Sequence, residues 1–160
     1  MTLEEYAFLA EIIGTILVVV SLIYVAQQLR QNTKMARIAA SEQGVKAELD
    51  LTEPIIGNRE FAEVWAKGDQ QFDSLDEPDR WRLLFFERRA IVWWHYVYQL
   101  RQQGLYRDAD WQNVIGIIRA VCCRQAIRES WSMFKDGFEK PFRDFLEEQF
   151  AIADGGAARD

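Results

Sequence analysis

The sequence predicts an all-α protein, in which an N-terminal transmembrane helix continues into a stalk and is followed by a compact bundle of four to five helices. Three observations predict this class. Residues 7–26 form an apolar segment of 20 residues, later apolar residues recur at spacings of three and four, and no stretch shows the alternation of a β-strand. The expected division is an anchor at 1–30, a stalk at 31–53, a cytoplasmic helical domain at 54–152 and a disordered tail at 153–160.

The apolar segment is long enough to cross a bilayer. As an α-helix, its 20 residues span about 30 Å, which is the hydrocarbon thickness of a typical membrane, and Glu11 is the only charged residue among them. The segment lacks the basic start and the small-residue cleavage site of a signal peptide. A buried central helix of a soluble protein has a similar composition over residues 12–26, so it remains the alternative.

Positive charges follow the segment at Arg30, Lys34 and Arg37, and apart from the amino terminus none precedes it. The positive-inside rule therefore predicts a single-pass protein of the cell inner membrane, with its N-terminus outside and its C-terminal domain in the cytoplasm. A reducing compartment agrees with Cys122 and Cys123, because one adjacent pair is neither a disulfide framework nor a zinc site. We interpret both as core thiols.

One face of the apolar segment is small and polar. At 100° per residue this stripe consists of Glu11, Gly14, Val18, Ser21, Val25 and Gln28. Small and polar residues on one face of a membrane helix are typical of helix–helix contact, which predicts a homo-oligomer. In one interpretation Glu11 lines the oligomer centre or a water-filled pore. In the other it lies in the headgroup layer of a lone anchor.

Caps and breakers define the first helices. No proline interrupts residues 1–53, so the first helix should continue out of the bilayer until Pro54 and Gly57 break it. Asn58 is expected to cap a short helix that Gly68 closes.

The later helices follow from the same signals. Ser74, with Glu77 three residues on, predicts a helix that runs to about Gln103 and stops at Gly104. Asp108 can cap the next helix, which continues or kinks near the cysteines. Pro141 opens a last amphipathic helix, which carries Phe142, Phe145, Leu146 and Phe150 on one side.

Composition restricts the function. With 19 basic and 25 acidic residues the net charge is −6, and neither half of the chain is basic, so nucleic-acid binding is disfavoured. A solitary histidine excludes two-histidine metal sites, and there is no glycine-rich phosphate loop. The sequence therefore indicates no metal, no cofactor and no small-molecule substrate. Six tryptophans, ten phenylalanines and five tyrosines predict an aromatic core.

The one histidine, His95, lies within residues 90–100, which contain no charged side chain. Such a helix is usually buried, which predicts a core histidine hydrogen-bonded to a neighbour. Arg88 precedes His95 by seven positions, and this spacing resembles the Arg-x(4–6)-His signature of the HEPN superfamily of all-α ribonucleases. The resemblance implies that dimerisation pairs Arg88 and His95 of two copies to promote cleavage by the RNA's own 2′-hydroxyl. HEPN-like folds also occur in membrane-associated accessory proteins of antiviral defence.

Four segments, "AEIIGTILVVVSLIYVAQQLRQNTK", "NREFAEVWAKG", "RWRLLFFERRAIVWWHYVYQLRQQGL" and "KPFRDFLEEQF", resemble in order and spacing a group of small bacterial membrane-anchored helical proteins with no known activity. The resemblance implies an anchor followed by a compact helical domain, and it implies no catalytic residue. We therefore expect a non-enzymatic membrane protein that homo-oligomerises through its transmembrane helix and its cytoplasmic domain, as a scaffold or a pore. The alternative is a membrane-tethered HEPN-like ribonuclease, or its inactive descendant, that uses Arg88 and His95.

Overall fold

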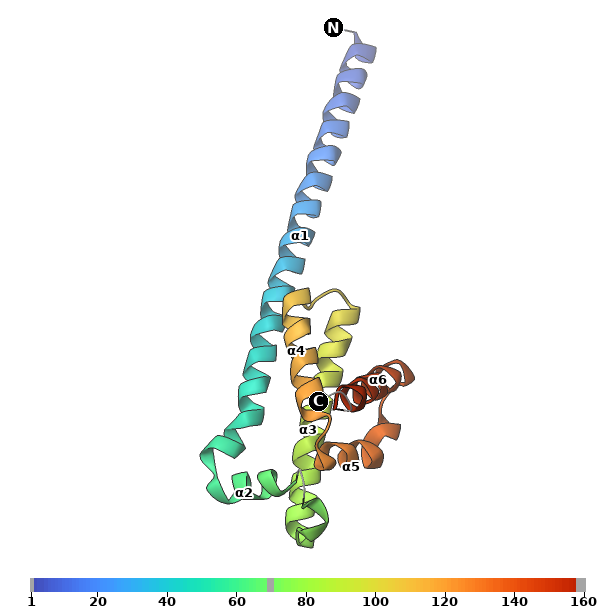
Figure 1. Ribbon diagram of the computed structural model, residues 1–160. Helices are drawn as coiled ribbons and strands as arrows, with labels where there is room; N and C mark the ends of the chain where they lie inside the picture. The colour runs from blue at the N-terminus through green and yellow to red at the C-terminus, as the bar shows by residue number, and fades with distance from the viewer. Residues whose placement is uncertain (1, 69–70, 158–160) are drawn as a thin grey trace. The chain divides into compact units, whose positions relative to one another are not determined.

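The computed structural model describes residues 2–68 and 71–157, and over these residues it contains helices and no strand (Figure 1). This confirms the predicted all-α class. The helices are α1 (Leu3–Gly57), α2 (Arg59–Lys67), α3 (Glu77–Gln102), α4 (Asp108–Val121), α5 (Gln125–Phe134) and α6 (Lys140–Ala157), with 3₁₀ turns at Phe72–Ser74 and Lys135–Gly137.

The chain forms two compact units, residues 1–39 and residues 40–160. The division falls inside α1, so residues 40–53, which the sequence assigns to a stalk, belong to the second unit. The physical reason is a run of small residues on one face of α1. Ala40 is buried, Ala47 packs against the core, and a Cβ added at Gly44 would lie only 3.0 Å from the hydroxyl oxygen of Tyr106. Small side chains thus allow this part of α1 to pack closely.

The first helix boundaries follow the predicted caps except at Pro54. The Asn58 side-chain oxygen accepts a hydrogen bond from the Phe61 amide at 2.9 Å, and Gly68 is the C-cap of α2, as predicted. The predicted break at Pro54 is wrong, because α1 continues through Pro54 to Gly57. Proline removes one amide donor, and this loss is tolerated so close to the end of a helix.

The start of α3 also differs from the prediction. Asp76, not Ser74, is its N-cap, and the Asp76 carboxylate accepts a hydrogen bond from the Asp79 amide at 2.9 Å. The Ser74 hydroxyl instead donates to the Gln71 carbonyl at 2.7 Å within the preceding 3₁₀ turn. The helix ends at Gln102, and Gly104 follows with φ of +69°, a conformation that favours glycine.

The last three helices are separated by short breaks. Asp108 is the first residue of α4, with Arg107 at the N-cap, so the predicted aspartate cap is wrong. The chain turns at residues 122–124 between α4 and α5. Residues 153–157 are helical, because α6 extends to Ala157, and the rest of the predicted tail lies outside the described residues.

The second unit is built around aromatic and aliphatic side chains. The interior of α3 contributes Ile91, Trp94 and Val97, each at most 1% exposed, and α6 contributes Phe142 and Leu146, both at 0%. A second buried cluster lies where α2, the first 3₁₀ turn, the beginning of α3 and the beginning of α5 meet: Val64, Phe72, Leu75, Leu83, Leu84 and Ala126. The predicted aromatic core is therefore present.

Candidate functional site

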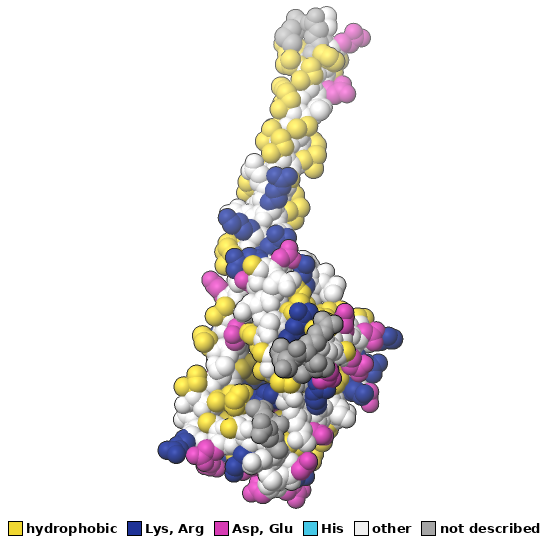
Figure 2. All heavy atoms as spheres, viewed as in Figure 1, with side chains coloured by type: hydrophobic (Ala, Val, Ile, Leu, Met, Phe, Trp, Pro, Cys, Tyr) yellow, Lys and Arg dark blue, Asp and Glu magenta, His cyan; other side chains and the backbone are white. Residues whose placement is uncertain are grey.

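The first unit exposes its whole apolar surface. Every side chain that the structure describes from Thr2 to Ala39 is exposed, and Figure 2 shows hydrophobic side chains along this part of α1. Within the described residues, α1 is the one helix long and apolar enough to be a candidate membrane span, and none of its most apolar stretch is buried. Among the residues that the structure describes, none covers this surface.

Polar side chains of this stretch are bonded within the same helix. The Thr15 hydroxyl donates to the Glu11 carbonyl at 2.8 Å, and the Ser21 hydroxyl donates to the Leu17 carbonyl at 2.8 Å. The Gln28 amide donates to the Tyr24 hydroxyl at 3.0 Å. Such local bonds lower the cost of placing polar groups in an apolar environment, because each donor keeps an acceptor.

The predicted stripe lies on exposed helix surface at all six positions, Glu11, Gly14, Val18, Ser21, Val25 and Gln28. Its members are spaced alternately by three and four residues, which is the spacing of a heptad seam. A Cβ added at Gly14 would meet nothing within 4 Å, so there is open space beside this glycine. The geometry thus presents a continuous narrow face.

Arg88 and His95 both lie on α3, but they contact different residues. The Arg88 guanidinium lies over the Phe134 ring, 5.2 Å from its centroid. His95 is 22% exposed, and its Nε2 is 3.3 Å from a carboxylate oxygen of Glu139. The His95 ring also packs on Phe142, with ring centroids 4.8 Å apart. The His95 ring is therefore positioned by the Phe142 ring and the Glu139 carboxylate.

A buried ion pair escaped the sequence analysis. Arg124 and Glu87 lie 3.0 Å apart, with side chains 6% and 3% exposed. Arg124 also donates to the Trp65 carbonyl at 2.7 Å, and its guanidinium stacks 3.6 Å from the Trp65 ring centroid. The pair thus joins α2, α3 and the residue before α5. In the sequence Glu87 stands directly before Arg88 and Arg89, and nothing in that order indicates that its partner is Arg124.

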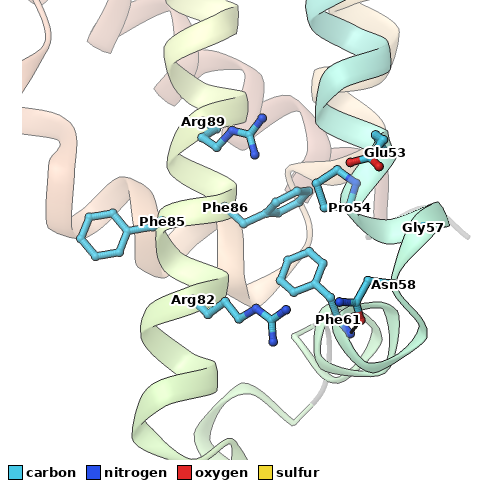
Figure 3. A pocket seen from close by; sticks show the side chains of 9 residues that line it. All are labelled: Glu53, Pro54, Gly57, Asn58, Phe61, Arg82, Phe85, Phe86 and Arg89. Carbon is cyan, nitrogen blue, oxygen red and sulfur yellow. Dashed lines mark hydrogen bonds between the residues drawn. The ribbon is translucent and has the colours of Figure 1, made fainter.

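A cavity of about 560 Å³ opens between the C-terminal end of α1, α2 and α3 (Figure 3). All of its lining residues belong to the second unit: Glu53, Pro54, Gly57, Asn58, Phe61, Arg82, Phe85, Phe86 and Arg89. In Figure 3 the side chains of Arg82, Arg89 and Phe86 extend from α3 toward Glu53 and Asn58. No sequence motif indicates this site, because its residues come from different helices.

The two cysteines differ in accessibility. Cys122 is buried and Cys123 is exposed, and both are free thiols. Burial raises the pKa of the Cys122 thiol to about 12. The interpretation as a core thiol therefore holds for Cys122, whereas Cys123 lies at the surface.

No protein-family model, no curated protein and no solved structure matches this chain. The described residues also contain no group of three or more His, Cys, Asp or Glu side chains that could hold a metal ion. The chain's own geometry is therefore what bears on its function.

Proposed function

We propose that this chain is a membrane-anchored, non-enzymatic helical protein that homo-oligomerises through its transmembrane helix and its cytoplasmic domain, as a scaffold or a pore. The observation that carries the proposal is the exposed apolar surface of α1. Large side chains such as Leu17, Leu22 and Ile23 are 54–64% exposed. Covering one such side chain stabilises by about 1.5–3 kcal/mol, so covering the whole stretch favours a bilayer by tens of kcal/mol.

Two further features support a bilayer over a protein partner as the cover. Residues 12–29 carry no charged side chain on any face, whereas a helix that docks on a protein surface usually has one apolar face and a charged opposite face. Its serine and threonine hydroxyls bond to the helix itself at 2.8 Å, so they demand no external acceptor.

The orientation can be tested with a native thiol. In the proposed topology Cys123 lies in the cytoplasm of the cell inner membrane. A membrane-impermeant maleimide should therefore label it only after the membrane is permeabilised, and a Thr2→Cys variant in a Cys123→Ser background should be labelled from outside. Labelling of Cys123 in intact spheroplasts would overturn the orientation.

Self-association is proposed to occur along the stripe, because the seam combines heptad spacing with the small residues Gly14 and Ser21. Gly14→Leu together with Ser21→Leu should reduce the particle mass in detergent. The matched control is Val19→Leu together with Val20→Leu, which enlarges side chains about 130° around the helix and should leave the mass unchanged. An unchanged mass for the stripe variant would remove the stripe as the interface.

Conduction separates a pore from a scaffold. If Glu11 lines a water-filled path, Glu11→Gln should reduce cation flux through protein reconstituted in liposomes. If the wild-type protein gives no cation flux, the pore is excluded and the scaffold remains the proposed function.

A second candidate is the HEPN-like ribonuclease or its inactive descendant. One observation favours it: Arg88 and His95 lie seven residues apart on α3, which is about two helical turns, and the His95 side chain is 22% exposed. His95→Ala should then abolish cleavage of single-stranded RNA while retaining the particle mass. Purified protein without any His95-dependent cleavage would exclude this candidate.

A further inference from the structure

We propose that the side of α1 that carries Arg30, Lys34 and Arg37, called here the basic face, binds the phosphate groups of anionic membrane lipids such as phosphatidylglycerol. The proposal rests on the membrane anchor proposed above, and it assigns a lipid partner to that anchor. All three side chains are exposed and belong to the first unit. Figure 2 shows Lys and Arg side chains on α1 where its apolar stretch ends.

The three cations of the basic face lie on one side of the helix. At the α-helical rotation of about 100° per residue, they fall within an arc of about 60°. The chain carries −6 overall, yet no acidic residue occurs from residue 12 to residue 41. Positive charge is therefore locally concentrated directly after the apolar segment, where the surface of a bilayer with anionic lipids is negative.

Arg30 and Lys34 are available for an external anion. Among the residues that the structure describes, none forms an ion pair with either of them. By contrast, Arg101, Arg107 and Arg128 in the second unit each lie 2.6–2.7 Å from an aspartate oxygen. A lipid phosphate can therefore supply the anionic partner that the described chain does not give to Arg30 and Lys34.

The distance from the apolar segment places two of these cations at the lipid phosphates. At a rise of about 1.5 Å per residue, Arg30 lies about 6 Å beyond Ala26, within a headgroup layer of about 5–8 Å. Lys34 lies about 12 Å beyond Ala26. Side chains of an α-helix lean toward its N-terminus, which is here the bilayer side, so the long lysine stem brings its ammonium group back toward the phosphates.

Arg37 lies farther out, about 17 Å beyond Ala26 along the helix axis. Salt screens a charge over about 8–10 Å, so Arg37 contributes through a weakened field and not through a direct contact. The geometry thus orders the three cations by their effect on lipid binding. Arg30 and Lys34 contribute most, and Arg37 contributes least.

Native mass spectrometry of the full chain in non-ionic detergent tests the lipid partner. Phosphatidylglycerol and phosphatidylcholine with the same acyl chains are supplied in equal amounts, so that only the headgroup charge differs. One cation near an anionic headgroup favours binding about fivefold, so we expect a preference of at least about tenfold for phosphatidylglycerol. The preference should decrease as salt is raised. Equal occupancy by the two lipids would overturn the proposal.

Variants assign the preference to the basic face. Arg30→Gln and Lys34→Gln should each lower it about threefold to fivefold, and Arg37→Gln less than twofold. The matched control is Lys46→Gln together with Arg59→Gln, which removes two exposed cations of the second unit and should keep the preference. A preference that persists when Arg30 and Lys34 are both replaced, or that falls equally in the control, would overturn the assignment.

Carbonate extraction of membranes separates failure of this proposal from failure of the anchor. Protein that stays in the washed membrane and prefers phosphatidylglycerol supports both. Protein that stays in the membrane without a lipid preference retains the anchor and overturns the lipid contact. Protein that carbonate releases overturns both the anchor and the lipid contact that depends on it.

Discussion

The two longest stretches of the chain without charged side chains are residues 12–29 of α1 and residues 90–100 of α3, and their surroundings are opposite. In α1 every side chain of the stretch is exposed. In α3, Ile91, Trp94 and Val97 are almost fully covered by protein. Apolar composition alone therefore does not say whether the rest of the protein covers a helix.

The difference lies in side-chain shape and in neighbouring helices. The α1 stretch is mainly aliphatic, and its Thr15, Ser21 and Gln28 side chains bond within the helix. The α3 stretch carries large aromatic and polar side chains that reach partners on other helices, as in the 3.1 Å bond from the Tyr96 hydroxyl to Gln43. A stretch with such groups has specific protein contacts to make, whereas the α1 stretch needs only an apolar environment.

The largest expected effect is the loss of stability when a charged partner is removed inside the second unit, compared with a charge change on the exposed surface of α1. Arg124→Met leaves the Glu87 carboxylate buried without its cation and should lower the free energy of unfolding by about 3–5 kcal/mol. Denaturant titration followed by tryptophan fluorescence measures this, and all six tryptophans follow residue 64, so the signal comes from the second unit. Adding Glu87→Gln should recover part of the loss, whereas Glu11→Gln alone should leave the transition unchanged. If the loss in the double variant equals the sum of the losses in the two single variants, Arg124 and Glu87 do not stabilise the fold as a pair.

The next largest effect is the difference between truncating a leucine in the second unit and truncating one in the first unit. Leu146 is fully buried, so Leu146→Ala should cost about 2–5 kcal/mol in the same titration, from lost burial and the cavity left behind. Leu17 is 61% exposed, and Leu17→Ala should change the transition by less than about 0.5 kcal/mol. Equal effects of the two variants would contradict the contrast.

Replacing glycine by alanine should have a smaller effect on stability, and the effect should have opposite signs at Gly68 and Gly116. A Cβ at Gly68 would lie 2.6 Å from the Leu83 side chain and 3.1 Å from the Trp65 carbonyl oxygen, so Gly68→Ala should destabilise by about 1–3 kcal/mol. Gly116 lies inside α4 with nothing within 4 Å of an added Cβ, so Gly116→Ala should stabilise by about 0.5–1 kcal/mol. Thermal unfolding of both variants checks the signs, and destabilisation by Gly116→Ala would contradict the open surface on α4.

The smallest effect sharpens the boundary between surface and core within the second unit. Cys123 should react with a thiol reagent in the native protein, while Cys122 should react only after unfolding. Because burial raises the pKa of Cys122 to about 12, the folded state keeps its proton where the unfolded thiol, with a pKa near 8.5, loses it. Stability from this group is therefore complete below about pH 8.5 and is lost as the pH rises toward 12. If both thiols react with the reagent at equal rates in the native protein, Cys122 is not buried.

Local signals predicted the helix boundaries well where one residue decides the outcome. Asn58 caps α2 and Gly104 ends α3, because each acts on its own few backbone groups. The prediction failed where two nearby residues could serve as the cap, because Asp76 and not Ser74 is the N-cap of α3. Residues 40–53 belong to the second unit, because Gly44 and Ala47 pack against residues far along the chain.

The sequence by itself determined the helical class, the long apolar segment, the stripe on its surface and the aromatic character of the core, since periodicity and composition act along a single helix. Tertiary structure alone decided which side chains meet. The Glu87–Arg124 pair joins residues 37 positions apart, and the Arg82–Arg89 cavity is completed by Glu53 and Phe61 from other helices. Such sites depend on how helices pack against one another, and no spacing within one helix encodes that arrangement.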